Sequence, residues 1–537
     1  MKTYRAILFC SGAAALSLEL LASRVLTPYF GVSLYIWSGI LSITLISLAA
    51  GYWLGGRLTH SDGMSSSSLK YYFGLLPGIA SICLTLVCVV YPFLFWKLAT
   101  LHLIAGSFIA SSLMLMIPLV AIAAMNPLLV ALVGTVPSVK RGDAGAGNVF
   151  FISTVGSVFG VNVTAFILIP GTSNFKSLLC VAIFLGIFPG LLSVLEKKLK
   201  PVFRRRLQAS FLTSMIFCTL VFLLSDRILS RHQAVVHNNS TFELLEEVPS
   251  FHTDVKVLKK VTKFDDGSSQ VFYYYTTFGL VQSRVLENGS SASAFPYCLE
   301  AIGRGVHDRP RDLLILGLAG GTLPMRLQDP GMKLDIVDIE PEASRLASQY
   351  FYFSHPRAEI YTMDARVFVR ETQNTYDLVF FDLFGMESAP DHLMTKEFFQ
   401  DTLRLLNPGG RLVMNTIENP QPKRNSPHYC LLNTLLEVYA KLMVFHDGTP
   451  GVKNVFIAAS PDENLEYNVP SLVNIPNPIH SILSKTIEAD KKVRWDLVRQ
   501  SLIFTDDFNQ YAVLKSDDLL IRRRENIRSL PRMVFSN

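Results

Sequence analysis

Long apolar stretches dominate the chain up to Asp226. As helices, seven of them are long enough to cross about 30 Å of hydrocarbon. They lie near residues 5–27, 35–56, 72–95, 102–134, 148–170, 174–195 and 208–225. The pattern therefore predicts a multi-pass α-helical membrane domain over residues 1–226. The fourth stretch contains Pro118 and Pro127, so we expect it to bend or to continue along the membrane interface.

The pattern changes after about residue 240. Residues 253–263 and 269–285 are rich in β-branched and aromatic side chains, and Asp265-Asp266-Gly267 separates them. Such runs on either side of a turn predict a small β-hairpin subdomain. We place it with a linker in residues 227–310.

The last part of the chain, residues 311–537, is predicted to be an α/β domain. From 312 to 460, short apolar runs alternate with amphipathic segments, which is typical of a doubly wound Rossmann-like fold with a parallel sheet. A further helix is expected over residues 479–502.

Charge and composition change this picture in one respect, which is orientation. Half of the 537 residues are hydrophobic, and the net charge is +6. The densest basic loop, residues 197–206, predicts a cytoplasmic position for itself and for the N-terminus. Seven spans would then leave the α/β domain outside, although nucleoside cofactors are found inside cells. We expect a multi-pass protein of the cell (inner) membrane whose soluble domain faces the cytoplasm, against the charge pattern.

Four residues of the apolar part invite a specific interpretation. Glu19 and Arg24 are charges within the first stretch. They are either functional, or Arg24 reaches the interface while Glu19 pairs with a neighbouring helix. Gly156 and Gly160 form a GxxxG pattern, which we interpret as close helix packing.

The seven cysteines occur singly, without a CxxC motif or a Cys/His cluster. This pattern favours neither disulfides nor a metal site, and we expect no metal. Cys298 is either a reactive thiol or, more in keeping with free cysteine in general, a small buried hydrophobic residue.

The candidate chemistry begins at a glycine-rich turn. The apolar run Leu313–Leu316 ends at Gly317, followed by Gly320 and Gly321. A second apolar run ends at Asp338, about 20 residues beyond the first glycine. This order predicts strand, turn, helix and strand, with the turn close to a nucleoside.

Two further acids follow strand-like runs. Asp364 comes after Ala358–Tyr361, with Ala365 next to it, and Asp382 ends the run that starts at Tyr376. Ligands of open α/β sheets bind at the carboxyl ends of strands. Asp338 is therefore expected to accept ribose hydroxyls, Asp364 to accept an adenine amino group, and Asp382 to face the reacting end of the ligand.

Residues 240–515 resemble the polyamine aminopropyltransferase (spermidine synthase) family, which has the class I S-adenosylmethionine methyltransferase fold. The matching segments are FGLVQSRV, VDIEPE, MDARVFV, LMTKEFFQDTLRLLNPGGRLV and FTDDF. The apolar segments resemble the N-terminal region of membrane-fused spermidine synthase-like proteins. The resemblance implies that Gln282 faces the active site and that Asp338 and Asp364 hold the nucleoside.

The sequence also departs from the family pattern. Ala319, Gly385 and Leu299 stand where the family has acids that serve amine binding and transfer. Glu387 and Asp391 lie nearby and could substitute. His392 is a candidate base, or a loop histidine that packs or caps.

These observations leave three functions open. The first is aminopropyl transfer to a polyamine from decarboxylated S-adenosylmethionine, with Asp382 and His392 as catalytic candidates. The second is methyl transfer from S-adenosylmethionine, which the missing acids favour. The third is a sensor or transporter whose α/β domain binds a nucleoside or polyamine without turnover. Expected partners are the lipid bilayer and a small-molecule amine or other acceptor, with a homodimer as a further option and no nucleic acid.

Overall fold

The computed structural model describes residues 1–32, 34–60, 65–134, 143–231, 233–384, 389–488 and 493–536. The chain forms two compact units. The helical unit contains Met1–Gln233, Pro249–Phe251 and Leu530–Asn537, and the α/β unit contains Ala234–Val248 and His252–Ser529. The limits differ from the predicted domains, because the strands before residue 310 join the α/β unit and the last residues join the helical unit.

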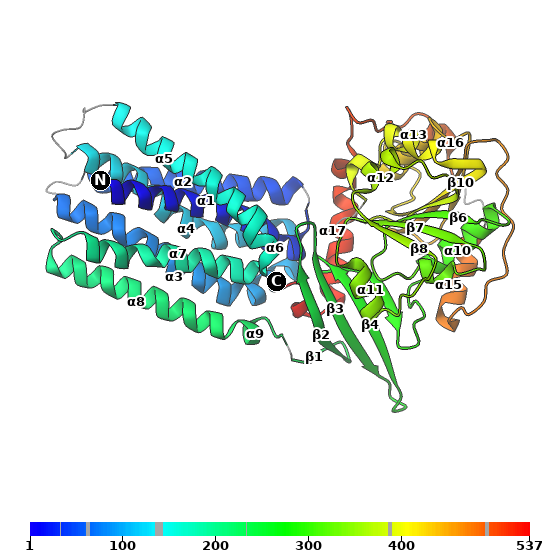
Figure 1. The fold of residues 1–537 in the computed structure, drawn as a ribbon, viewed down its shortest axis with the longest axis horizontal. Helices are drawn as coiled ribbons and strands as arrows, with labels where there is room; N and C mark the ends of the chain where they lie inside the picture. The colour runs from blue at the N-terminus through cyan, green and yellow to red at the C-terminus, as the bar shows by residue number, and fades with distance from the viewer. Residues whose placement is uncertain are drawn as a thin grey trace. The chain divides into compact units, whose positions relative to one another are not determined.

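In the helical unit, seven helices among the described residues are long and apolar enough to cross a membrane. Each overlaps one predicted stretch. They are α1 (Lys2–Phe30), α2 (Leu34–Thr59), α3 (Ser66–Leu101), α4 (Leu103–Gly134), α5 (Asp143–Val163), α7 (Asn174–Leu195) and α8 (Pro201–Leu223) (Figure 1). Helix α5 continues as a π-helix, η1 (Thr164–Leu168), and as α6 (Ile169–Gly171), and α8 is followed by α9 (Ser225–Ile228). Helix α4 passes through Pro118 and Pro127 as one helix.

Helices α1 and α5 pack with almost no space between their backbones. A Cβ atom on Gly156 would lie 2.0 Å from the carbonyl oxygen of Phe9, and one on Gly160 would lie 2.2 Å from that of Ala13. The Ser157 hydroxyl donates to the carbonyl of Gly12 at 3.0 Å. The prediction that the GxxxG pattern serves packing is confirmed, since only glycine fits there.

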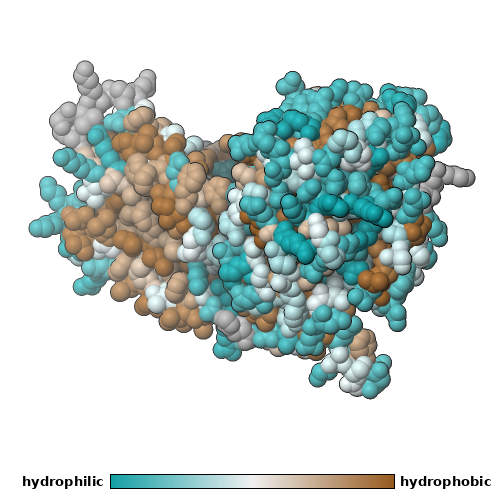
Figure 2. Space-filling view, turned by 45° about the vertical axis from the view of Figure 1, so that its right-hand side comes forward, coloured by the Kyte–Doolittle hydropathy of each residue, from teal (hydrophilic) through white to brown (hydrophobic). Residues whose placement is uncertain are grey.

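The surface of the helical unit differs from that of the α/β unit in polarity. Large apolar side chains such as Leu45, Ile216 and Leu223 are exposed on it. Figure 2 shows hydrophobic residues over the helices and hydrophilic residues over most of the α/β unit. Within the helical unit, the Arg24 guanidinium donates to the carbonyls of Ser250 and Phe251, at 2.8 and 3.0 Å. Arg24 therefore binds main-chain oxygens near the helix end, as expected of an arginine that reaches an interface.

The first sheet of the α/β unit is antiparallel. In the described chain it has five strands in sequential order, β1 (Val235–His237), β2 (Ser240–Pro249), β3 (Asp254–Lys263), β4 (Ser269–Thr277) and β5 (Leu280–Leu286). The predicted turn at Gly267 joins β3 and β4. The run 269–285 is not one strand, because Phe278 and Gly279 have φ angles of 47° and 75° and turn the chain between β4 and β5.

The second sheet is mixed and has seven strands in the described residues, in the order β11-β12-β10-β9-β6-β7-β8. They are β6 (Asp312–Leu316), β7 (Lys333–Asp338), β8 (Ala358–Thr362), β9 (Tyr376–Phe381), β10 (Leu406–Glu418), β11 (Lys441–Phe445) and β12 (Lys453–Ser460). Strands β6 to β10 are parallel, and β12 pairs antiparallel with both β10 and β11. The strand order reverses at β6, which is where such sheets bind ligands.

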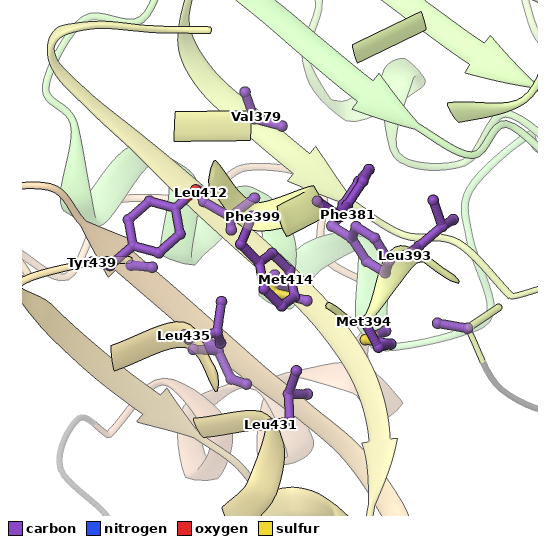
Figure 3. Close-up of a cluster of buried hydrophobic side chains, with 14 of the residues drawn as sticks. Val379, Phe381, Leu393, Met394, Phe399, Leu412, Met414, Leu431, Leu435 and Tyr439 are labelled. Carbon is purple, nitrogen blue, oxygen red and sulfur yellow. The ribbon is translucent and has the colours of Figure 1, made fainter. Parts of the chain in front are cut away.

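Helices cover both faces of this sheet. On one face pack α10 (Phe295–Val306), α11 (Ala343–Tyr350) and α15 (Asn477–Ile487). On the other pack α12 (Ala365–Glu371), α13 (Lys396–Arg404), α14 (Pro427–Leu436) and α16 (Trp495–Val498). Figure 3 shows the second core, in which Phe381, Met414 and Phe399 belong to neighbouring elements. The two cores hold the strand ends that carry the acids.

Three expectations about elements were wrong. Between β6 and β7 there is only a 3₁₀ turn, η2 (Pro324–Arg326), because Pro324 and Asp329-Pro330-Gly331 leave no uninterrupted helical segment. The single helix expected over 479–502 is α15 and α16, with residues 489–492 outside the described part. Helix α17 (Tyr511–Ser529) was not predicted. The chain ends in a 3₁₀ turn, η4 (Arg532–Val534).

Candidate functional site

The glycine-rich turn leaves β6 against the end of β9. Gly317 has a φ of +107°, and a Cβ atom there would lie 2.3 Å from the carbonyl oxygen of Asp382. Gly321 also has a positive φ, +69°. The N–H of Gly320 donates to the Ser283 hydroxyl of β5 at 3.2 Å. The turn therefore lies between β9 and the antiparallel sheet, with two positions that only glycine occupies without strain.

Asp338, at the end of β7, organises this turn. Its Oδ2 accepts from the N–H groups of Leu318 and Ala319, at 2.8 and 3.2 Å, and its Oδ1 accepts from that of Glu340 at 2.9 Å. Burial raises the pKa of Asp338, and the three backbone N–H groups oppose this shift. A carboxylate has about four acceptor sites, so about one is left for a ligand hydroxyl.

Asp364 and His392 were predicted in different roles, and the structure brings them together. Asp364 caps α12, and its Oδ1 accepts from the N–H groups of Arg366 and Val367. Its Oδ2 lies 3.1 Å from Nε2 of His392, in the 3₁₀ turn η3 (Asp391–Leu393). Ala365 is buried as the first residue of α12. The His392 side chain is 49% exposed, and this contact favours a histidine that packs on the loop over a base.

Asp382 follows β9 directly and is held by a side chain. The amide Nδ2 of Asn415, in β10, donates to its Oδ1 at 2.8 Å, and the amide of Asn454 in turn donates to Oδ1 of Asn415 at 2.9 Å. Burial raises the pKa of Asp382 to about 6. Asp382 is therefore ionised at neutral pH but more basic than an ordinary aspartate, which suits a group that accepts a proton.

Gln282 lies on β5, next to Ser283. Its amide Nε2 donates to the Thr277 hydroxyl at 2.8 Å, across the turn that separates β4 and β5. Ser283 contacts the glycine-rich turn, so β5 brings Gln282 to the same end of the second sheet. The sequence suggested Gln282 but gave no signal for Ser283 or Asn415.

The positions that depart from the family pattern are not equivalent. Ala319 lies in the turn, with a φ of 45° and its N–H on Asp338. Leu299 is a core residue of α10, and burial raises the pKa of the neighbouring Cys298 to about 12, so that Cys298 is a buried thiol rather than a reactive thiolate. Asp391 is exposed in η3. Gly385 and Glu387 lie outside the described residues.

Helix α17 supplies a buried ion pair that sequence analysis missed. The ammonium of Lys515 lies 2.6 Å from Oε1 of Glu418, the last residue of β10, and neither side chain is exposed. The hydroxyl of Tyr511 donates to the same oxygen at 2.9 Å. The two partners are far apart in the sequence, so no local pattern could have joined them.

The strand order, the glycine-rich turn and the acids at the strand ends define a Rossmann-like domain of the S-adenosylmethionine methyltransferase type. A family model described as the spermine/spermidine synthase domain matches residues 298–448. The polyamine aminopropyltransferase of Vibrio vulnificus is 31% identical over 235 residues, which cover 41% of this chain and 76% of that protein. The chain belongs to the polyamine aminopropyltransferase family.

Two further similarities are weaker. An N-terminal histidine N-methyltransferase of Emericella nidulans is 33% identical over 113 residues, and the match spans only 20% of each protein. Among solved structures, a probable spermidine synthase from Corynebacterium glutamicum matches with a TM-score of 0.36 at 17% identity, over 47% of this chain and 93% of that one.

Proposed function

We propose that the α/β unit transfers an aminopropyl group from decarboxylated S-adenosylmethionine to an amine, the polyamines being the acceptor class that the name of the Vibrio relative suggests. The observation that carries this proposal is Asp382, a carboxylate with a pKa of about 6 beside the glycine-rich turn. It lies where the strand order reverses, next to the elements proposed to hold the nucleoside.

The chain's residues fit a nucleoside donor. The turn has backbone but little side chain, Asp338 has about one acceptor site left for a ribose hydroxyl, and Asp364 lies at the end of the next strand, β8. In this arrangement Asp338 and Asp364 bind the nucleoside. Gln282 faces the same edge from β5. A sulfonium donor supplies an electrophilic carbon, so the protein needs only to position the amine and to take its proton.

The transfer step balances without a metal or an oxidant. The acceptor reaches the site as an ammonium and loses one proton to the Asp382 carboxylate. The amine nitrogen then attacks the aminopropyl carbon bonded to sulfur. A C–N bond forms, the C–S bond breaks, and its electron pair stays on sulfur, which leaves as neutral 5′-methylthioadenosine. The second proton of the attacking nitrogen is lost to water or stays on the charged product.

The test is to incubate the purified full-length protein with each sulfonium donor and an amine. Release of 5′-methylthioadenosine from the decarboxylated donor is expected. Release of S-adenosylhomocysteine from S-adenosylmethionine would instead identify methyl transfer, which the alanine at position 319 and the similarity to a methyltransferase favour. Neither product with any acceptor would leave a binding role for the domain and contradict both reactions.

We further propose that the helical unit crosses the inner cell membrane and that the α/β unit faces the cytoplasm. Seven apolar helices support the first part. The second part rests on the supply of the donor inside cells and goes against the basic loop at 197–206. Alkaline phosphatase fused after Asn537 is expected to be silent, and a cytoplasmic reporter there is expected to be active. The opposite result would place the domain outside and contradict the cytoplasmic enzyme.

A further inference from the structure

The acceptor end of the site extends beyond Asp382 along β10. Strands β9 and β10 are parallel neighbours, and Asn415 of β10 reaches Asp382. Glu418 lies three residues further along the same strand, about 10 Å at 3.3 Å per residue. A carboxylate at that distance is a candidate partner for the far ammonium of a diamine whose near nitrogen lies at Asp382.

That carboxylate already has an ammonium of the chain itself. Lys515 contacts Oε1 of Glu418 at 2.6 Å and also donates to the carbonyl of Ile417. Both charged side chains are fully buried, where screening by water and salt is weak. The pair as a whole is neutral, so it does not attract a second cation.

The same face of α17 carries two more charges of opposite sign. Asp518 interacts with Lys515 and with the main-chain N–H of Asn419. Arg522, one turn further, places its guanidinium 6.0 Å from the ring of Phe384, two residues beyond Asp382. Positions 515, 518 and 522 share one helix face. Each acid on this face of the site therefore has a cation of the chain within one helical turn.

One acceptor site remains on Glu418. Its Oε2 is buried and has no hydrogen-bond partner among the residues that the structure describes. An uncharged donor such as a hydroxyl would satisfy this oxygen without adding a positive charge beside Lys515.

We infer that Lys515 supplies from the chain the second ammonium that a diamine would otherwise bring, so that the site takes a primary amine whose far end is uncharged and polar. This inference rests on the proposed function, since it concerns the acceptor of that same site. It makes Lys515 and Glu418 specificity-determining residues, with Asp382 as the group that contacts the reacting nitrogen.

The experiment compares two acceptors of equal length, 4-amino-1-butanol and 1,4-diaminobutane, which differ in a far hydroxyl or ammonium. Binding of each to the full-length protein saturated with 5′-methylthioadenosine is measured by calorimetry, and kcat/KM is measured with the decarboxylated donor. The amino alcohol is expected to be favoured by about tenfold or more in both. Tenfold preference for the diamine in binding would overturn the inference. Binding in the expected order without turnover would contradict aminopropyl transfer but not the inference.

Charge variants then test whether Lys515 is the cause. Lys515→Met leaves Glu418 without compensation and is expected to shift the preference toward the diamine by about tenfold or more. Glu418→Gln/Lys515→Met removes both charges and is expected to restore the wild-type preference. Lys396→Met, which breaks an exposed lysine–glutamate pair of 2.8 Å, is the matched control and should change nothing. Equal preference in Lys515→Met and wild type would refute the role of Lys515, and the wild-type comparison stands if that variant does not fold.

Discussion

The two sides of the proposed site hold their carboxylates in different ways. On the nucleoside side, Asp338 and Asp364 accept hydrogen bonds from main-chain N–H groups within the same strand–turn segments. On the acceptor side, Asp382 and Glu418 are held by side chains that lie far along the chain, Asn415 and Lys515. Backbone partners fix geometry whatever the neighbouring side chains are, whereas side-chain partners change with single substitutions. The nucleoside side is therefore the constant part of the fold, and the acceptor side is where specificity varies.

The largest expected effect is on the acceptor side. Asp382→Asn keeps the shape and removes the charge that takes the proton, so kcat should fall by about 10²–10⁴ with little change in donor affinity. The measurement is single-turnover release of 5′-methylthioadenosine, with donor binding by calorimetry. Asp377→Asn is the matched control, because Asp377 lies at the other end of β9 and accepts from the N–H of Arg311 at 2.7 Å. Full activity of Asp382→Asn would show that Asp382 is structural.

On the nucleoside side, Asp338→Ala should weaken nucleoside binding at least about tenfold. The substitution removes a charge-assisted acceptor for ribose and also leaves three main-chain N–H groups without their partner. Calorimetry with 5′-methylthioadenosine measures the affinity, and thermal unfolding should show a lower Tm. Glu342→Ala, four residues away in an exposed ion pair, should leave the affinity unchanged. Unaltered affinity of Asp338→Ala would refute the ribose assignment.

The pH dependence of kcat/KM should separate the two sides. The pKa of Asp382 is raised to about 6, so its basic form is present above that pH and is lost as the pH falls through it. Below pH 6 the rate should drop by about tenfold per pH unit, while 5′-methylthioadenosine affinity stays nearly flat. Asp377→Asn should retain this limb. A profile that is flat down to pH 5 would exclude Asp382 as the base.

The smallest effect is expected for His392→Ala. The ring is half exposed and bonded to Asp364, on the nucleoside side, so its removal loses one solvent-accessible hydrogen bond. We expect kcat to change by less than about threefold and nucleoside affinity by less than about tenfold. Steady-state rates and calorimetry measure both. A hundredfold loss of kcat would return His392 to the role of a base.

The sequence predicted what depends on local order. The seven apolar helices, the strands that end at Asp338 and Asp382, and the hairpin at Gly267 follow from runs of apolar or turn-forming residues. Helix α17 could not be predicted in this way, because Lys515, Arg523 and other charged residues of that helix are buried by partners distant in the sequence. The expected helix after the glycine-rich turn was wrong since Pro324 and Pro330 outweigh the motif.

The same limit applies to the candidate site. A carboxylate at a strand end can be located from sequence, but its partners cannot. Asn415 lies in an ordinary strand pattern, and Ser283 differs from its neighbours in no way that marks it. His392 was proposed as a base from its residue type alone, and only the contact with Asp364 shows which side of the site it belongs to.

The position of the last residues has a topological consequence. Leu530–Asn537 belongs to the helical unit, where Arg532 lies 3.6 Å from the ring of Phe93 and Phe535 packs on Tyr29. The α/β unit is thus an insertion, fastened to the same bundle at its entry and at its exit. The exit segment is far shorter than the about 20 residues that a spanning helix needs. A reporter at the C-terminus and the α/β unit must therefore share one compartment, so a single fusion reads the location of both.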